Sequence, residues 1–296
     1  MNTYWPISMP GYYNWKVAML LRKKRKITHD RTPDMSLLKS HWQNALAEFL
    51  GTALLVSIGI SVVILDFGSG SPVKEIIPDP VLRRLITGFL FGSTGAAIAI
   101  SFLGKISGAH INPVVSLAFY ITGKLRSNTV IIYILSQLAG GIVGALPLLL
   151  WGHTGRSIDF GATLPGKGYT FWEAAGGEVV TTFFLIISLF IFIGHKRLRN
   201  FTPLLFPFLY SIMVYLEAPL SGTSTNPARS LGPMIISQNY TGWWIYWIGP
   251  VIGMLIAVAV HKYALFRYFE IEVAKLYHFE HDPHGIFHQA ISNPKK

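Results

Sequence analysis

The stretch Ser221–Pro233, SGTSTNPARSLGP, is echoed 114 positions upstream by Ser107–Ser116, SGAHINPVVS. In both stretches a Ser-Gly pair precedes an Asn-Pro pair. An Asn-Pro pair starts a helix cleanly, because asparagine caps the helix and proline at the first helical position lacks only an N–H that would have no partner there. Two such starts predict one structural device that the chain uses twice.

The composition is that of a membrane protein. Of 296 residues, 51% are hydrophobic and only 13% are charged, and the mean hydropathy is +0.43. These values are too apolar for an ordinary soluble domain. Six runs approach or reach the roughly 20 apolar residues that a membrane-spanning helix needs, and they lie at 45–65, 85–103, 130–151, 174–194, 201–216 and 243–260.

The net charge of +11 is compatible with a nucleic-acid partner, but the placement of the charges indicates a membrane instead. Six spans put most basic residues on one side of the bilayer, and positive residues favour the cytoplasmic side. We therefore expect a multi-pass protein of the plasma (cell inner) membrane, with both termini cytoplasmic and no nucleic-acid partner. The basic residues concerned are Arg22–Lys26, Lys105, Lys124, Arg126, Lys196, Arg197, Arg199 and those from Lys262 onward.

The sequence lacks the patterns typical of a catalytic or metal site. It contains no cysteine, which excludes disulfides, thiolate chemistry and cysteine-containing metal sites. Neither HExxH nor GxSxG occurs, so we expect no catalytic residues, no cofactor and no metal. Four histidines near the end leave a metal site or a pH sensor open as an alternative to a solvated tail. They are His278, His281, His284 and His288.

Two acids reveal an internal repeat. Glu48 and Glu178 each lie in an apolar run, and each half continues with a second span, a loop, an Asn-Pro segment and a third span. Three crossings per half make the second half enter the membrane from the opposite face, so the repeat is inverted. An acid within a span is costly and must be hydrogen-bonded. We expect each acid to support a loop, with a proton-carrying role as the alternative.

The repeat divides the chain into three parts. Residues 44–265 are predicted to form the membrane domain, with repeat one at about 44–151 and repeat two at about 171–265. Residues 1–43 are expected to be a basic cytoplasmic tail, either flexible or lying on the anionic inner leaflet. Residues 266–296 are expected to be a second cytoplasmic tail.

The segments that follow the two Asn-Pro pairs are too short to cross a bilayer. Residues 114–121 and 228–236 each hold about nine residues, or roughly 13 Å of helix, against about 30 Å of hydrocarbon. Two half-helices entering from opposite sides would meet with their N-termini at the midplane, and their loops are tolerable only beside a wet cavity. The predicted fold is therefore an all-α membrane protein with six transmembrane helices and two half-helices in an inverted repeat.

The meeting point has the chemistry of a pore for neutral molecules. Two helix N-termini place about half a positive elementary charge each at the midplane, which repels cations. Asn112 and Asn226 would offer amide donors to a water or a hydroxylated solute. Arg229 lies three residues after Asn226 and should face the same aqueous path, where it adds a second barrier to cations. A structural arginine held by loop carbonyls is the alternative.

Together, AEFLGT at 47–52, SGAHINP at 107–113 and TNPARSLGP at 225–233 resemble the aquaporin family, the major intrinsic proteins. The resemblance covers roughly residues 44–265. It implies an aquaporin-like fold, one pore per subunit and a homotetramer in the lipid bilayer. Two Asn-Pro-Ala motifs mark the pore midpoint in this family, and Val114 stands where the first motif usually has alanine. The residues implied are Asn112, Pro113, Val114, Asn226, Pro227 and Ala228.

The resemblance also implies a selectivity filter of four positions. A count without gaps from the two asparagines places them at Gly92, Val214, Thr223 and Arg229. Water-selective relatives have an aromatic residue and a histidine at the first two, so this filter would be wider and similar to that of the nodulin-26-like branch. A one-residue gap would put Phe91 in place of Gly92. Moreover, Gly88 and Gly92 have the GxxxG spacing of close helix packing, as do Gly140 and Gly144.

Other positions favour water. Ser230 stands where glycerol facilitators have aspartate, and Tyr246-Trp247 matches an aromatic pair of water-type members. We expect a passive channel, not an enzyme, that conducts water and small uncharged solutes and excludes ions and protons. One alternative is a channel mainly for glycerol or for silicic, boric or arsenious acid. Another is an ion-coupled secondary transporter, which would need Glu48 or Glu178 as a coupling acid.

Overall fold

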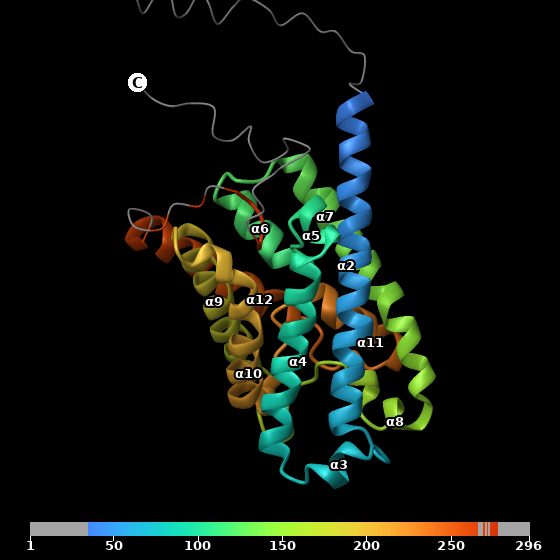
Figure 1. The fold of residues 1–296 in the computed structure, drawn as a ribbon. Coiled ribbons are helices and arrows are strands. Elements are labelled where there is room, and N and C mark those ends of the chain that lie inside the picture. Colours follow the sequence, from blue (N-terminus) through green and yellow to red (C-terminus); the bar gives the residue numbers. More distant parts are fainter. Residues whose placement is uncertain (1–34, 266–268, 270, 272, 278–296) are drawn as a thin grey trace, which may run out of the picture. The chain divides into compact units, whose positions relative to one another are not determined.

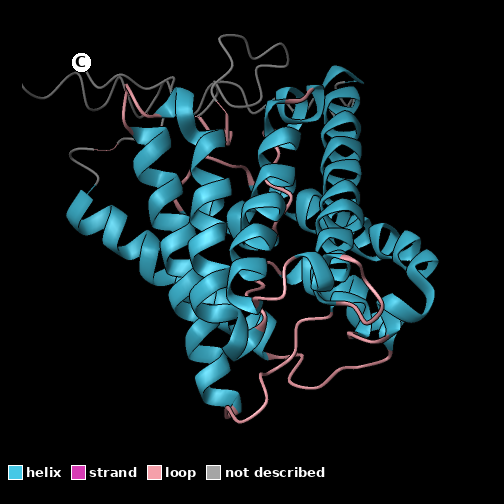
Figure 2. Ribbon diagram, turned by 60° about the horizontal axis from the view of Figure 1, so that its bottom comes forward, coloured by secondary structure: helices cyan, strands magenta, loops and turns pink. Residues whose placement is uncertain are grey.

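The computed structural model describes residues 35–265, 269, 271 and 273–277. Within these residues every regular element is a helix, as Figure 2 shows. Residues 39–296 form one compact unit, which contains both Asn-Pro segments, and residues 1–38 form another. Residues 1–34 of the predicted N-terminal tail and the histidines His278, His281, His284 and His288 lie outside the described residues.

Six long helices correspond to the six predicted spans (Figure 1). Five of them are long and apolar enough to cross a membrane. The sixth, α4, has 21 residues and the length to cross, but Arg83 and Arg84 in its first turns lower its mean hydropathy. The six are α2 (Met35–Phe67), α4 (Pro80–Ile100), α7 (Ser127–Ala145), α9 (Phe171–Gly194), α10 (Thr202–Ser221) and α12 (Ile245–Val260).

The two half-helices form where the Asn-Pro pairs predict them. Helix α6 (Pro113–Ile121) has nine residues and helix α11 (Pro227–Ser237) has eleven. The side chain of Asn112 accepts from the N–H of Val114 at 2.9 Å, and that of Asn226 accepts from the N–H of Ala228 at 3.0 Å. Both helices therefore start with an asparagine cap and a proline, and the predicted all-α fold is confirmed.

Short helices connect the long ones and leave the two Asn-Pro loops in the interior. Helix α9 begins with a capping box, in which Thr170 accepts from Glu173 N at 3.2 Å and Glu173 accepts from Thr170 N at 2.7 Å. The short helices are α3 (Val73–Ile76), α5 (Phe102–Ser107), η1 (Leu146–Trp151), α8 (Gly152–Arg156), η2 (Asp159–Gly161), η3 (Arg199–Phe201) and η4 (His261–Leu265).

Glycines allow the long helices to pack backbone to backbone. A Cβ atom added at Gly88 or Gly92 of α4 would collide with the backbone of α10, and one added at Gly140 or Gly144 of α7 would collide with the backbone of α2. The close packing predicted from the two GxxxG spacings is confirmed. Gly92 in particular lies against the Phe206 carbonyl and Pro207, where α4 crosses α10.

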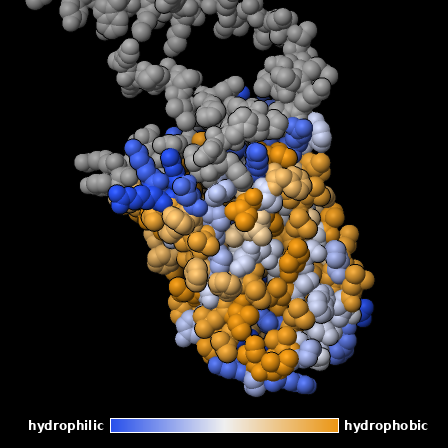
Figure 3. Space-filling view, viewed as in Figure 1, coloured by the Kyte–Doolittle hydropathy of each residue, from blue (hydrophilic) through white to orange (hydrophobic). Residues whose placement is uncertain are grey.

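The surface of the helical unit is apolar between its ends. Figure 3 shows orange, hydrophobic side chains over most of the middle of this face, with blue, hydrophilic ones gathered toward the ends. Because these side chains have no protein to pack against, lipid is the solvent that suits them. The fold is that of a multi-pass membrane protein. Exposed apolar side chains include Leu54, Ile58, Leu135, Phe208, Ile212 and Leu255.

We expect Gly92→Ala to destabilise the protein by about 1–3 kcal/mol, the usual cost of an added methyl in a packed interior. The gain of up to about 1 kcal/mol from replacing glycine by alanine in a helix will not offset it. The measurement is thermal unfolding of the purified protein in detergent. Gly95→Ala is the matched control, because its Cβ would have only Leu55 nearby, at 3.9 Å. Equal melting temperatures for the two variants would contradict the prediction.

Candidate functional site

The first Asn-Pro loop is held by one buried carboxylate. Glu48, on α2, accepts from the backbone N–H of His110 at 2.9 Å and of Ile111 at 2.7 Å. Gln137, on α7, donates to the same carboxylate at 2.7 Å and to Ser116 at 2.9 Å. Glu48 and Gln137 are fully buried. The carboxylate therefore accepts hydrogen bonds from two backbone N–H groups that lie outside any helix and have no helical carbonyl acceptor.

The second loop repeats this arrangement with other residues. Glu178, on α9, accepts from the N–H of Ser224 at 2.6 Å and of Thr225 at 2.8 Å. It also accepts from the hydroxyl of Ser221 at 2.7 Å. Glu178 is fully buried, as Glu48 is. The two acids that were singled out in the sequence thus make matching contacts in the two repeats.

Alternate residues of both loops have left-handed backbone conformations. The φ angles are 51° at Ala109 and 43° at Ile111 in the first loop, and 53° at Thr223 and 52° at Thr225 in the second. Side chains branched at Cβ rarely adopt such angles. Each loop turns its N–H groups toward its glutamate in this way, and the same backbone path appears twice.

The two half-helices are tied together at their starts. Asn112 Nδ2 donates to the carbonyl oxygen of Thr225, and Asn226 Nδ2 donates to that of Ile111, both at 2.9 Å. Each amide nitrogen has a second hydrogen that is not used in these bonds. Both asparagines line a cavity, whereas Val114 is fully buried. The extra methyls of Val114 therefore lie behind the meeting point and not in it.

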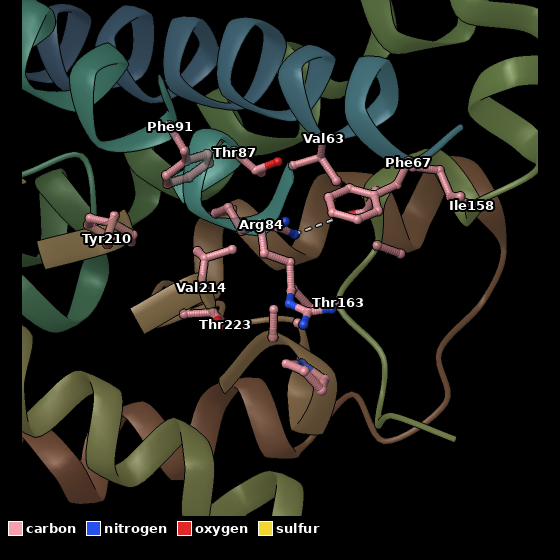
Figure 4. A pocket seen from close by; sticks show the side chains of 16 residues that line it. Val63, Phe67, Arg84, Thr87, Phe91, Ile158, Thr163, Tyr210, Val214 and Thr223 are labelled. Atoms are coloured by element: carbon pink, nitrogen blue, oxygen red, sulfur yellow. Dashed lines mark hydrogen bonds between the residues drawn. The ribbon is translucent and has the colours of Figure 1, made fainter. Parts of the chain in front are cut away.

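A larger cavity lies on the Arg229 side of the asparagines, and we call it the Arg229 cavity. It has a volume of about 290 Å³ and is mostly apolar, and its polar side chains are Arg84, Thr87, Thr163, Tyr210, Thr223 and Arg229 (Figure 4). Of the described residues that line it, none is acidic. Val214 and Thr223, two predicted filter residues, lie in its wall. The two charged side chains in the described lining, Arg84 and Arg229, are both positive, and positive charge in a cavity wall disfavours cations.

Arg229 is both held by a loop and turned to this cavity. Its side chain is 4% exposed, and Nη1 donates to the carbonyl oxygen of Gly161 at 2.9 Å. The guanidinium lies 6.0 Å from the ring centroid of Phe91. The structure thus combines the two interpretations of Arg229 that the sequence left open, a loop-bound arginine and a cavity-lining one.

The structure brings Phe91, and not Gly92, beside Arg229. Phe91 lines the Arg229 cavity, whereas Gly92 faces the α10 backbone and contributes only to the smaller cavity described next. Consecutive residues of a helix point about 100° apart, so a count that is one residue off selects a different face of α4. The placement of Phe91 corresponds to the one-residue gap.

The second cavity, which we call the Leu276 cavity, lies at the asparagines. Its volume is about 40 Å³, room for very few water molecules. Phe91 and Tyr210 line both cavities, with their ring centroids 5.4 Å apart. The two cavities are therefore adjacent, with these rings in the wall that they share. The other walls of the Leu276 cavity include Asn112, Asn226, His110, Val115 and Leu276.

One of the last described residues, Leu276, lies in the wall of this second cavity. Leu276 N donates to the carbonyl oxygen of Gly108 at 3.1 Å, and His110 Nε2 bonds to that of Ala274 at 3.0 Å. Lys275 Nζ donates to the carbonyl oxygen of Lys105 at 3.2 Å. Ala274 and Leu276 are buried. The sequence predicts a tail at residues 266–296, but within it Ala274 and Leu276 bond to the first Asn-Pro loop.

Sequence reasoning also missed Glu217, which is 6% exposed at the end of α10. It bonds to Ser221 and, at 2.5 Å, to Thr223. The available signal was an acid close to the end of an apolar run, in YLEAPLSG at 215–222. Within the described residues there is no group of three or more histidine, aspartate or glutamate side chains that could hold a metal ion.

Comparison with known proteins gives a single family. A sequence profile of the family described as Major intrinsic protein matches residues 35–261. Probable aquaporin PIP2-7 of Oryza sativa subsp. japonica is 32% identical over 238 residues, covering 76% of this chain and 80% of that protein. Aquaporin AqpM of Methanothermobacter marburgensis is 33% identical over 238 residues, with 75% and 96% covered.

Two further relatives agree. Aquaporin-4 of Mus musculus is 33% identical over 227 residues, covering 76% of this chain and 68% of that protein. The solved structure of an aquaglyceroporin from Plasmodium falciparum has the same fold, with a TM-score of 0.61 and 18% identity over 76% of this chain and 97% of its own. With the paired Asn-Pro loops and the two half-helices, these matches show that the chain belongs to the major intrinsic protein family, the channel family of the aquaporins.

Proposed function

We propose that this protein is a passive channel for water and small uncharged solutes, and that it excludes ions and protons. The observation that carries the proposal is that the two cavities are adjacent: they share Phe91 and Tyr210, and residues at the starts of the half-helices line them. A solute crossing the membrane would pass Arg229, then the two rings, then Asn112 and Asn226. Each step offers hydrogen bonds to a neutral molecule at a mostly apolar wall.

Ion exclusion rests on charge and on desolvation. Cations would approach the Arg229 guanidinium and then two helix N-termini, each with about half a positive elementary charge. The walls supply few oxygen ligands to replace the hydration shell of an ion, which makes its entry costly. Asn112 and Asn226 each donate one amide hydrogen to a carbonyl oxygen of the opposite loop, and the second amide hydrogen of each can bond to the solute. The arrangement favours a neutral molecule with an acceptor oxygen.

For the filter, the proposal takes Phe91, Val214, Thr223 and Arg229, with Phe91 in place of Gly92. An aromatic ring beside Arg229 narrows the opening, as in water-selective relatives, while Val214 leaves one wall apolar where those relatives have histidine. This composition supports water as the main solute and small uncharged molecules as additional ones. A glycerol or metalloid-acid channel remains the second candidate, because Val214 makes that wall apolar and one similar structure is named an aquaglyceroporin.

The proposal also covers assembly and placement. The channel domain would occupy residues 44–265, and the subunits would form homotetramers in the plasma membrane with both termini cytoplasmic. The basic loop residues support this orientation, and the family resemblance supports the tetramer. Under this orientation the Arg229 cavity opens to the outside and the Leu276 cavity faces the cytoplasm.

The test is stopped-flow light scattering on vesicles that contain the purified protein, with water, glycerol, urea and boric acid. We expect water flux above that of empty vesicles and no proton flux. Arg229→Ala should raise proton leak by about tenfold or more, since even ~1.4 kcal/mol of lost repulsion is a factor of ten. Arg156→Ala, on the short helix α8, is the control. Water flux equal to that of empty vesicles would reject the proposal.

The filter assignment predicts the effect of Phe91→Ala. Removal of the ring opens the wall that the two cavities share, so glycerol permeability should rise several-fold while water permeability changes less. Phe89→Ala on the same helix is a matched control, because Phe89 is 40% exposed and lies against Phe208 instead of the cavity. Both permeabilities are measured in the vesicle assay. If Phe91→Ala leaves the ratio of glycerol to water unchanged, Phe91 is not a filter residue.

The position of Leu276 in the wall of the smaller cavity predicts an effect on water permeability. Leu276→Ala removes most of a side chain from the wall of a cavity of about 40 Å³, so we expect water permeability to increase with little change in solute preference. Leu255→Ala, at a lipid-exposed leucine of α12, should have no effect. A Leu276→Ala variant with wild-type water permeability per protein would show that Leu276 does not limit the path.

A further inference from the structure

The end of α10 contains a chain of hydrogen bonds that joins the Arg229 cavity to the buried acid Glu178. Thr223, in the cavity wall, donates from Oγ1 to Glu217 Oε2 at 2.5 Å. Glu217 Oε1 is hydrogen-bonded to Ser221 Oγ, which also bonds to Glu178 Oε1 at 2.7 Å. Two buried carboxyl groups are thus bridged by one hydroxyl group.

The number of hydrogens available for these bonds determines the protonation state of the two carboxyl groups. Ser221 Oγ has a single hydrogen, yet it lies between two carboxyl oxygens and also accepts from Thr223 N at 3.2 Å. One of its two carboxyl contacts must therefore be made with a hydrogen of the acid itself. Both oxygens of Glu178 already accept from backbone N–H groups, an arrangement that suits an ionised carboxylate. The extra hydrogen thus belongs to Glu217, which is a neutral carboxylic acid.

A neutral Glu217 fixes what Thr223 can do in the cavity. The one hydroxyl hydrogen of Thr223 is committed to Glu217, so toward a solute Thr223 can only accept a hydrogen bond. Arg229, in the wall of the same cavity, can only donate. A solute that bonds to both residues must donate a hydrogen bond to Thr223 and accept one from Arg229. A hydroxyl group does both.

We propose that Glu217 is a positioning residue for solute selection: it holds Thr223 as a hydrogen-bond acceptor in the same cavity as the Arg229 donors, and this cavity thereby favours hydroxylated solutes such as polyols and neutral oxyacids. The inference rests on the proposed channel function and deepens it. Glu217 acts through Thr223 and does not itself line the cavity.

The surroundings of Glu217 are shaped for its carboxyl group. A Cβ atom at Gly177 of α9 would collide with Glu217 Oε1, so the absence of a side chain at Gly177 makes the space that the acid fills. The first repeat has no matching acid among the described neighbours of its loop. There Gln137 bonds to Glu48 and Ser116 instead. The acid is therefore a feature of the Arg229 side alone and not a general need of the fold.

The experiment compares ethylene glycol with dimethyl sulfoxide in the vesicle assay, because the two are similar in size and only the first can donate a hydrogen bond. We expect Glu217→Leu to lower the ratio of their permeabilities by about two- to tenfold, the worth of one net hydrogen bond. Glu217→Gln should restore the ratio, because its amide can donate to Ser221 and accept from Thr223. Glu75→Gln, at an exposed acid of α3, is the control.

Two further variants separate positioning from folding. Gly177→Ala displaces the carboxyl group without removing it and should lower the ratio as Glu217→Leu does. In a Thr223→Val background, Glu217→Leu should add no further change, because the effect passes through Thr223. Melting temperatures in detergent report stability separately, so Gly177→Ala keeps the test open if Glu217→Leu does not fold.

The outcomes separate this inference from the channel proposal. A wild-type protein that conducts no water overturns both. A conducting protein whose solute ratio is unchanged by Glu217→Leu and Gly177→Ala overturns the role of Glu217 alone. If Glu217→Gln behaves like Glu217→Leu, a neutral hydrogen-bonding group is not sufficient, and the assignment of the hydrogen to Glu217 is overturned.

Discussion

The structure depends on pairing backbone N–H groups that lie inside the membrane without a helix. Each unpaired group there would cost several kcal/mol, so an irregular loop survives only with an internal acceptor. Glu48 and Glu178 each accept from two consecutive N–H groups, of His110 and Ile111 and of Ser224 and Thr225. Because one carboxylate serves each loop, both half-helices can begin in the protein interior, where their starts face the path.

The same backbone device carries different side chains in the two repeats. Around Glu48 the partners are neutral, with Gln137 bonded to both the acid and Ser116. Around Glu178 lie a second acid, Glu217, and the hydroxyl of Ser221 that bridges them. The asparagines are nearly equivalent, since each donates to the opposite loop at 2.9 Å. The two repeats therefore differ in the side chains around their acids, while the hydrogen bonds of the two asparagines are close to symmetric.

Much of the fold was predictable from the sequence, because the signals are local. Apolar runs give the spans, and the Asn-Pro pairs with the short segments after them give the half-helices. The positions that could not be predicted depend on contacts between distant residues. Phe91 and Gly92 are neighbours in sequence, and only the crossing with α10 decides which one faces Arg229. The contact of Leu276 with Gly108 joins the C-terminal region to the first loop, and no local pattern marks it.

In the proposed channel, the two cavities would have different roles. In a path of elements in series, the narrowest one limits the flux of every solute, whereas a polar constriction discriminates among solutes by the hydrogen bonds that it replaces. The Leu276 cavity, with about 40 Å³, is the narrow element, and its walls offer few groups besides Asn112 and Asn226. The Arg229 cavity, with about 290 Å³, contains the ordered donor and acceptor. Under the proposed function, Leu276 would limit the flux, Thr223 and Arg229 would select among solutes, and Phe91, which lines both cavities, would contribute to both.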